Sequence, residues 1–186
     1  MAVVALVAGS CGRGNTHGDG SPSYDAYGVS FVYPERWRLT ADTTAAPFIV
    51  ELELAGPRGA FCDLAVYGDT ADVDRMVQGL LEEFRAEFAG AREARLRPVR
   101  SSLAGVEARG VVWVIDTPEG RRMIHILAAN VGLRAVTLYW QALARDDDRV
   151  GEDIAPIMRA LEVEDLPSAH DLHAPAGLSA AVGRGS

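Results

Sequence analysis

The sequence predicts an α+β domain in which a mainly antiparallel sheet is covered by helices, as an α-β-α sandwich. Three observations lead to this fold class. Most apolar segments alternate with period two or run unbroken for a few residues, as strands do. Only two segments repeat their apolar residues at helical spacing. Short turns rich in Gly and Pro connect most strand segments, which favours antiparallel neighbours over parallel ones.

The first elements are a strand, a hairpin and a helix. The strand covers residues 29–33 and ends at Pro34, which has no N–H to donate to a ladder. Residues 48–54 alternate in polarity, and residues 61–67 return after a turn with Gly and Pro, so the two segments predict a β-hairpin. The helix extends from Asp72 to Ala89, with a regular apolar stripe and an aspartate that can cap its start.

Four strands and a second helix complete the predicted domain. The strands cover residues 93–101, 106–117, 123–129 and 135–142. Pro98 suits the first of them to the edge of a sheet. The second helix follows the acidic residues 146–148 and reaches Leu161, with Pro156 either near its start or at a kink.

Composition limits the classes of protein that remain possible. The 186 residues suffice for one domain with terminal tails, and 48% hydrophobic with 24% charged residues is typical of a globular chain. A net charge of −8 argues against a general nucleic-acid binder. All 18 basic residues are Arg, as in chains from GC-rich, actinobacterial-type genomes.

The N-terminal segment, residues 1–11, is an apolar stretch that ends in small residues directly before Cys11. This arrangement resembles the lipobox of bacterial lipoproteins, in which a signal segment is removed and the cysteine is lipidated. No basic residue precedes Cys11, and a start codon upstream of Met1 would explain that. We therefore expect an exported protein attached through Cys11 to the outer face of the cell membrane. A cytoplasmic protein with an unmodified cysteine is the alternative.

The segments around the domain are predicted to lack fixed structure. Residues 12–26 are rich in Gly and Ser and form a predicted flexible tether, followed by the domain over residues 27–165. Residues 166–186 show no periodicity and form a predicted disordered tail. His17 in the tether and two histidines in the tail, His170 and His173, are expected to be solvated side chains. We expect no metal site.

The start of the domain resembles a known family. Phe31, Tyr33, Pro34 and Trp37 are similar to the opening of the PsbP-like fold, which also occurs in actinobacterial lipoproteins of the LpqN type. The predicted order of elements from residue 27 to 163 agrees with this fold. The resemblance implies an α-β-α sandwich that binds proteins or small ligands and is usually not an enzyme. It brings no shared catalytic residues.

The candidate binding residues are two arginines and two tryptophans. Alternation places Arg95 and Arg97 on one face of their strand, where they could recognise an anionic head group or an acidic protein edge. The other interpretation is that the charges of Arg95 and Arg97 protect an edge strand from aggregation. Trp37 and Trp113 lie in or beside apolar strands and belong either to this binding surface or to the core.

No motif predicts catalysis or a cofactor. The sequence has no G-x-S-x-G, H-E-x-x-H, P-loop or dinucleotide glycine pattern. Cys62 lies in an apolar run without a nearby His and is predicted to be a buried small residue. His125 lies within a strand, where a hydrogen-bonded structural histidine is the simplest interpretation.

These observations predict a cell-envelope lipoprotein whose non-catalytic domain binds a partner protein or a small apolar ligand. A cytoplasmic adaptor or chaperone of the same fold is the first alternative. A hydrolase is the second, and it would need a site assembled only in the fold, such as His125 with a carboxylate and a hydroxyl.

Overall fold

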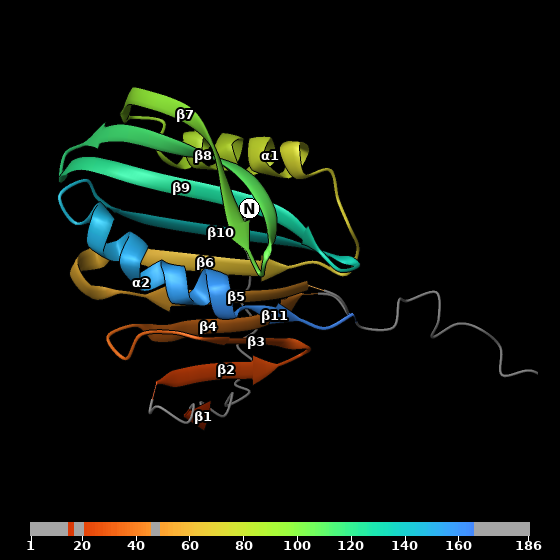
Figure 1. The fold of residues 1–186 in the computed structure, drawn as a ribbon. Helices are drawn as coiled ribbons and strands as arrows, with labels where there is room; N and C mark the ends of the chain where they lie inside the picture. Colours follow the sequence, from red (N-terminus) through yellow and green to blue (C-terminus); the bar gives the residue numbers. More distant parts are fainter. Residues whose placement is uncertain (1–14, 17–20, 46–48, 166–186) are drawn as a thin grey trace, which may run out of the picture.

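The computed structural model describes residues 15–16, 21–45 and 49–165. Seven strands form the central sheet, in the spatial order β4-β5-β6-β10-β9-β8-β7 (Figure 1). They are β4 (Arg38–Ala45), β5 (Ile49–Ala55), β6 (Phe61–Val66), β7 (Arg92–Leu103), β8 (Val106–Thr117), β9 (Gly120–Val131) and β10 (Arg134–Leu143). Every neighbouring pair is antiparallel, which confirms the predicted sheet.

Two helices, α1 (Val73–Glu87) and α2 (Asp147–Ala160), cover opposite faces of this sheet (Figure 1). The side chains of β9 show the two faces. Ile124 and Ile126 pack in one apolar core with α1, whereas Leu127 and Ala129 pack in the other core with α2. The alternation of one strand between two cores confirms the α-β-α sandwich.

A second, smaller sheet has the order β1-β2-β3-β11. Its strands are β1 (Asn15–Thr16), β2 (Pro22–Ala26), β3 (Val29–Val32) and β11 (Glu162–Val163). Tyr24 of β2 is 4% exposed, and its ring stacks on Phe31 with centroids 5.5 Å apart. The predicted tether over residues 12–26 is therefore wrong at 15–16 and 22–26. The ring of Tyr24 helps to anchor β2 by a contact that the local composition does not show.

Most of the other predicted elements are confirmed. The hairpin corresponds to β5 and β6, which are joined by the short 3-10 turn η1 (Pro57–Gly59), and the later strands correspond to β7 through β10. The carboxylate of Asp72 caps α1 by accepting a hydrogen bond from the Arg75 N–H at 3.1 Å. The sequence analysis missed β4, whose polar, Thr-rich sequence shows no apolar alternation.

Helix α2 begins at Asp147 and continues through Pro156, so a start near the proline is wrong. Proline removes one backbone hydrogen bond from a helix interior. Buried apolar residues lie on both sides of it, Ile154 and Ile157, each 0% exposed. Their burial in the core outweighs the lost hydrogen bond, so the helix continues through the proline.

Gly110 lets the hairpin of β7 and β8 lie unusually close to β9. A Cβ atom at this position would lie 1.8 Å from the carbonyl oxygen of Ile126, so only glycine permits this approach to β9. The tip of the hairpin reaches α2, where the N–H of Ala104 donates to the carbonyl oxygen of Met158 at 2.8 Å. The hairpin thus crosses from one layer of the sandwich to the other (Figure 1).

The predicted signal segment, residues 1–11, and the predicted tail, residues 166–186, lie outside the described residues, as do Cys11 and the three tail and tether histidines. In the part of the chain that the structure describes, no helix combines the length and apolar character needed to cross a membrane.

Candidate functional site

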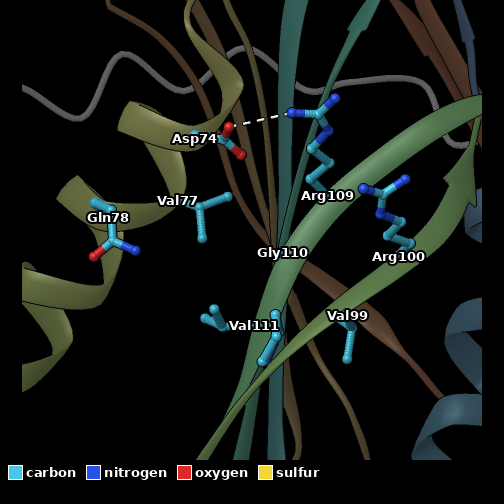
Figure 2. Close-up of a pocket in the computed structure, with 9 residues that line it drawn as sticks. Asp74, Val77, Gln78, Val99, Arg100, Arg109, Gly110 and Val111 are labelled. Atoms are coloured by element: carbon cyan, nitrogen blue, oxygen red, sulfur yellow. Dashed lines mark hydrogen bonds and ion pairs between the residues drawn. The ribbon is translucent and has the colours of Figure 1, made fainter.

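A groove of about 490 Å³ lies between the first half of α1 and the strands β7 and β8 (Figure 2). Its lining residues come from these three elements: Asp74, Val77, Gln78, Pro98, Val99, Arg100, Arg109, Gly110 and Val111. Gly110, where β8 approaches β9 too closely to leave room for a side chain, is one of the lining residues.

The groove has apolar side chains in its wall and charged side chains beside them. Val77 and Val111 are 4% and 7% exposed and belong to the core beneath α1. Arg109 pairs with Asp74 across the groove at 3.2 Å (Figure 2). Arg100 lies 3.6 Å from a carboxylate of β8, so both cations are already partly neutralised. An apolar wall with a few polar groups is typical of a ligand site of this volume.

The structure places Arg95 and Arg97 on one face of β7, as predicted. Their register partners on β8 are Val114 and Val112, which point away from α1. Both arginines are exposed, and neither forms an ion pair with another described residue. Strand β7 is also the edge of the central sheet, as predicted. Exposed arginines on an edge strand fit both interpretations, recognition of an anionic group and protection of the edge from aggregation.

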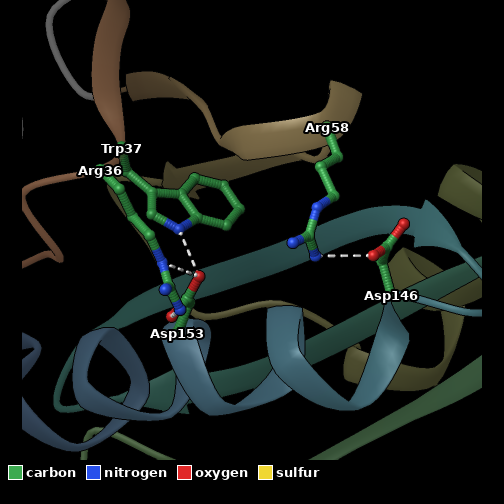
Figure 3. Close-up of polar contacts among 5 residues, drawn as sticks. All are labelled: Arg36, Trp37, Arg58, Asp146 and Asp153. Carbon is green, nitrogen blue, oxygen red and sulfur yellow. Dashed lines mark hydrogen bonds and ion pairs between the residues drawn. The ribbon is translucent and has the colours of Figure 1, made fainter.

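Trp37 is part of the core, so its assignment to a binding surface is wrong. It is 1% exposed, and its indole N–H donates to Asp153 Oδ2 of α2 at 2.9 Å (Figure 3). Arg36 donates to the same oxygen through Nε at 2.9 Å and pairs with the other carboxylate oxygen through Nη2. Gly56 makes room for the indole, because a Cβ there would lie 2.7 Å from the ring. Trp37 therefore connects α2, through Asp153, to the chain directly before β4.

Trp113 is also buried, and its assignment to a binding surface is wrong for the same reason. It is 3% exposed beneath α1, with its ring edge-on to Phe88 at 6.3 Å. Its indole N–H donates to Glu93 at 2.8 Å. That hydrogen bond, with a second from Arg85, lowers the pKa of the Glu93 carboxyl. Trp113 therefore packs in the core beneath α1 and is hydrogen-bonded to Glu93 on the edge strand β7.

The N-terminus of α2 is held by two polar contacts. Arg58 of η1 donates to Asp146 at 2.8 Å (Figure 3). His125 Nε2 lies 2.9 Å from Asp147 Oδ1, and the imidazole stacks on Trp140 with centroids 4.4 Å apart. The prediction of a hydrogen-bonded structural histidine is confirmed. Among the described residues His125 bonds to no hydroxyl group, so these contacts do not assemble a hydrolase triad.

Cys62 is 0% exposed, which confirms the predicted buried thiol. Burial raises the pKa of this thiol, so it does not ionise to a nucleophilic thiolate near neutral pH. Within the described ranges, no group of three or more His, Cys, Asp or Glu side chains is arranged to hold a metal ion.

The sequence analysis missed the residues of the groove and, outside it, Asp63. It is 5% exposed in the middle of β6, on a strand that otherwise carries only apolar side chains. A single charged residue within an apolar strand was the available signal. Burial raises the pKa of its carboxyl to about 7, with smaller contributions from the negative charges of Glu51 and Glu53.

Comparison with known proteins relates the chain to others through its fold. No protein-family model matches the sequence, and no curated protein matches it. Among solved structures, cyanobacterial PsbP (CyanoP) from Synechocystis sp. PCC 6803 matches with 13% identity and a TM-score of 0.55, over 84% of this chain and 99% of that chain. LpqN of Mycobacterium tuberculosis, described as involved in cell envelope biogenesis, matches with 14% identity and a TM-score of 0.45, over 80% and 88% of the two chains.

The chain therefore has a PsbP-like fold, as the residues at the start of the domain predicted. LpqN, of the type named in the sequence analysis, is among the matching structures, although the two folds superpose more loosely. The superposition on CyanoP shows the fold alone, and at 13% identity the function has to be argued from the site itself.

Proposed function

We propose that this chain is a cell-envelope lipoprotein whose PsbP-like domain binds a small apolar ligand without transforming it. The groove beside α1 is the observation that supports binding. Its volume of about 490 Å³ falls within the range of roughly 300–1,000 Å³ that is usual for small-molecule sites. Val77 and Val111 give it an apolar wall, and Arg109 with Asp74 gives it a polar border.

The proposed location rests on the sequence. The apolar segment over residues 1–11 ends in small residues before Cys11, which supports export and lipid attachment at the outer face of the cell membrane. Lipidation would hold an acidic domain at a membrane by its acyl chains. A cytoplasmic adaptor of the same fold remains the alternative, and it requires an unmodified Cys11.

A fluorescent fatty acid, dansylaminoundecanoic acid, tests the groove. We expect the full chain to bind it saturably and the variant Gln78→Trp to lose at least about tenfold in affinity, because a large side chain fills the groove. Gln78 is exposed, so the substitution does not disturb the core. Glu83→Trp, an exposed position on the opposite side of α1 from Asp74 and Gln78, is the matched control and should bind like the parent. If both variants bind the fatty acid with the same affinity, the groove is not the binding site.

Arg95 and Arg97 support a second candidate, the binding of an acidic partner protein. Both are exposed and lack ion pairs with other described residues, although each carries a full positive charge on an acidic protein. The double variant Arg95→Gln, Arg97→Gln separates the two interpretations. Weaker binding of an acidic peptide such as hexaglutamate supports recognition. Unchanged binding together with greater aggregation supports edge protection alone.

A further inference from the structure

Asp63 is an anomaly in the core of the sheet. It is 5% exposed, and no hydrogen bond or ion pair joins its carboxylate to another described residue. Buried carboxylates are normally hydrogen-bonded or paired, because an isolated charge loses its hydration without compensation. No described protein group therefore satisfies this carboxyl group, and only its small exposed part can meet water.

The strand register shows what surrounds this carboxyl group. Asp63 lies directly opposite Glu53 on β5 and opposite Tyr139 on β10, so the three side chains share the sheet face that carries α1. Glu51 lies on the same face, opposite the residue two positions after Asp63. Like charges on facing strand positions destabilise a sheet. None of the ion pairs among the described residues uses Asp63, Glu51 or Glu53.

Aromatic rings form the other side of this cluster. Tyr139 is half-buried, with its ring 4.7 Å from Phe84 of α1 in an edge-to-face contact and 5.7 Å from Phe61. Rings beside carboxylates favour a cation with an apolar body over a small hydrated ion, because the ring face attracts a partly desolvated cation. Glu53 is half-buried and Glu51 exposed, so the cluster opens to solvent over β5.

We infer that Asp63, Glu51, Glu53 and the ring of Tyr139 form a binding site for an organic cation, an alkylammonium or guanidinium group. Such a group offers Asp63 the hydrogen-bond donors that it lacks and neutralises the facing carboxylates. The site is separate from the groove of the proposed function, because β10 and β9 lie between β6 and β8 in the sheet. The cation can belong to a free amine or to a basic side chain of another protein, and the two sources share this chemistry.

Binding of an organic cation requires the ionised form of Asp63, so affinity depends on pH. Burial raises the pKa of this carboxyl to about 7. The charged groups that act on Asp63 are Glu51 and Glu53 of β5, and its own charge acts on Tyr139 of β10 and on Tyr67 after β6. From α1, Glu83 acts on Tyr67 and Glu87 acts on Tyr139. These acidic neighbours make the site more attractive to a cation at every pH at which they are ionised.

The test uses agmatine and an acetylated tetra-arginine peptide as probes of the full chain. Carboxyl-carbon NMR follows the titration of Asp63 with and without each probe. We expect a bound probe to lower the titration midpoint by about one pH unit or more, which corresponds by linkage to about tenfold tighter binding to the ionised form. Binding about tenfold tighter for the peptide than for agmatine would identify a basic protein segment as the source, whereas similar affinities would identify a free amine.

Two variants and one control complete the test. Asp63→Asn keeps the size of the side chain and should lose binding of both probes. Glu53→Gln, at a half-buried position, should weaken binding by about threefold or more. Glu82→Gln, on the solvent face of α1, removes the same charge elsewhere and should bind like the parent. The absence of saturable binding up to about 10 mM probe, or unchanged binding by Asp63→Asn, would overturn the inference.

Discussion

The variant Asp63→Asn should make the protein more stable at alkaline pH. In the unfolded chain an aspartate titrates near its ordinary value of about 3.9. In the folded protein burial raises the pKa of Asp63 to about 7. Between these two values the folded state holds a proton that the unfolded state has released. The free energy of unfolding contributed by this group therefore falls as pH rises from about 4 to about 7, and stays low above it.

The size of the effect follows from the pKa difference. About three pKa units at about 1.36 kcal/mol each mean that ionised Asp63 lowers the free energy of unfolding by about 4 kcal/mol above neutral pH. A buried amide without a partner has a cost of its own, about 1–3 kcal/mol. We therefore expect Asp63→Asn to raise the free energy of unfolding by about 1–3 kcal/mol near pH 8.5, and to leave it unchanged or slightly lower near pH 4.5.

Urea denaturation of the full chain at both pH values, followed by tryptophan fluorescence, measures this difference. Glu82→Gln, an exposed charge on α1, should stay within about 0.5 kcal/mol of the parent at both. Two results together would refute the description of Asp63 as an unpaired buried carboxyl. The variant Asp63→Asn would be no more stable than the parent near pH 8.5, and its free energy of unfolding would change with pH as that of the parent does.

Three further substitutions test the packing of the fold. Leu81→Ala should cost about 2–5 kcal/mol in urea denaturation, because the 1% exposed side chain leaves a cavity beneath α1; a loss below about 0.5 kcal/mol would contradict that packing. Gly110→Ala should cost about 1–3 kcal/mol or more and lower the Tm, because the new Cβ meets the backbone of Ile126; an unchanged Tm would contradict the close approach. Trp37→Phe should cost about 1–3 kcal/mol, because it removes the indole N–H that Asp153 accepts, and a neutral result would contradict that role.

The sequence predicted the parts of the fold that have a local pattern. The stripe of α1 and the alternation of β5 repeat within a few residues, and β8 contains an unbroken apolar run, so these elements were found with nearly their observed bounds. Strands β2 and β4 have no such pattern. Tyr24 helps to fix β2 through its ring on Phe31 and through its hydroxyl, which donates to Asp42 at 3.1 Å, and these contacts exist only after folding.

The candidate sites were harder to predict, because they depend on which faces meet. The spacing placed Arg95 and Arg97 on one face correctly, but it could not show that Trp37 and Trp113 lie beneath α2 and α1. The groove is lined by residues of α1, β7 and β8 together, and no motif indicates that these three elements meet there. Local sequence gives propensity and periodicity, whereas a site is a property of the assembled layers.

Phase separation in detergent tests the central claim, that a lipid on Cys11 holds this binding domain at the membrane. The full chain, expressed from its own gene with the upstream DNA, should enter the detergent phase and resist a salt wash, because two or more acyl chains give stable, unscreened attachment. The variant Cys11→Ala should stay in the aqueous phase or keep residues 1–10. Parent protein that stays in the aqueous phase with residues 1–10 still attached would contradict the lipoprotein and favour the cytoplasmic adaptor.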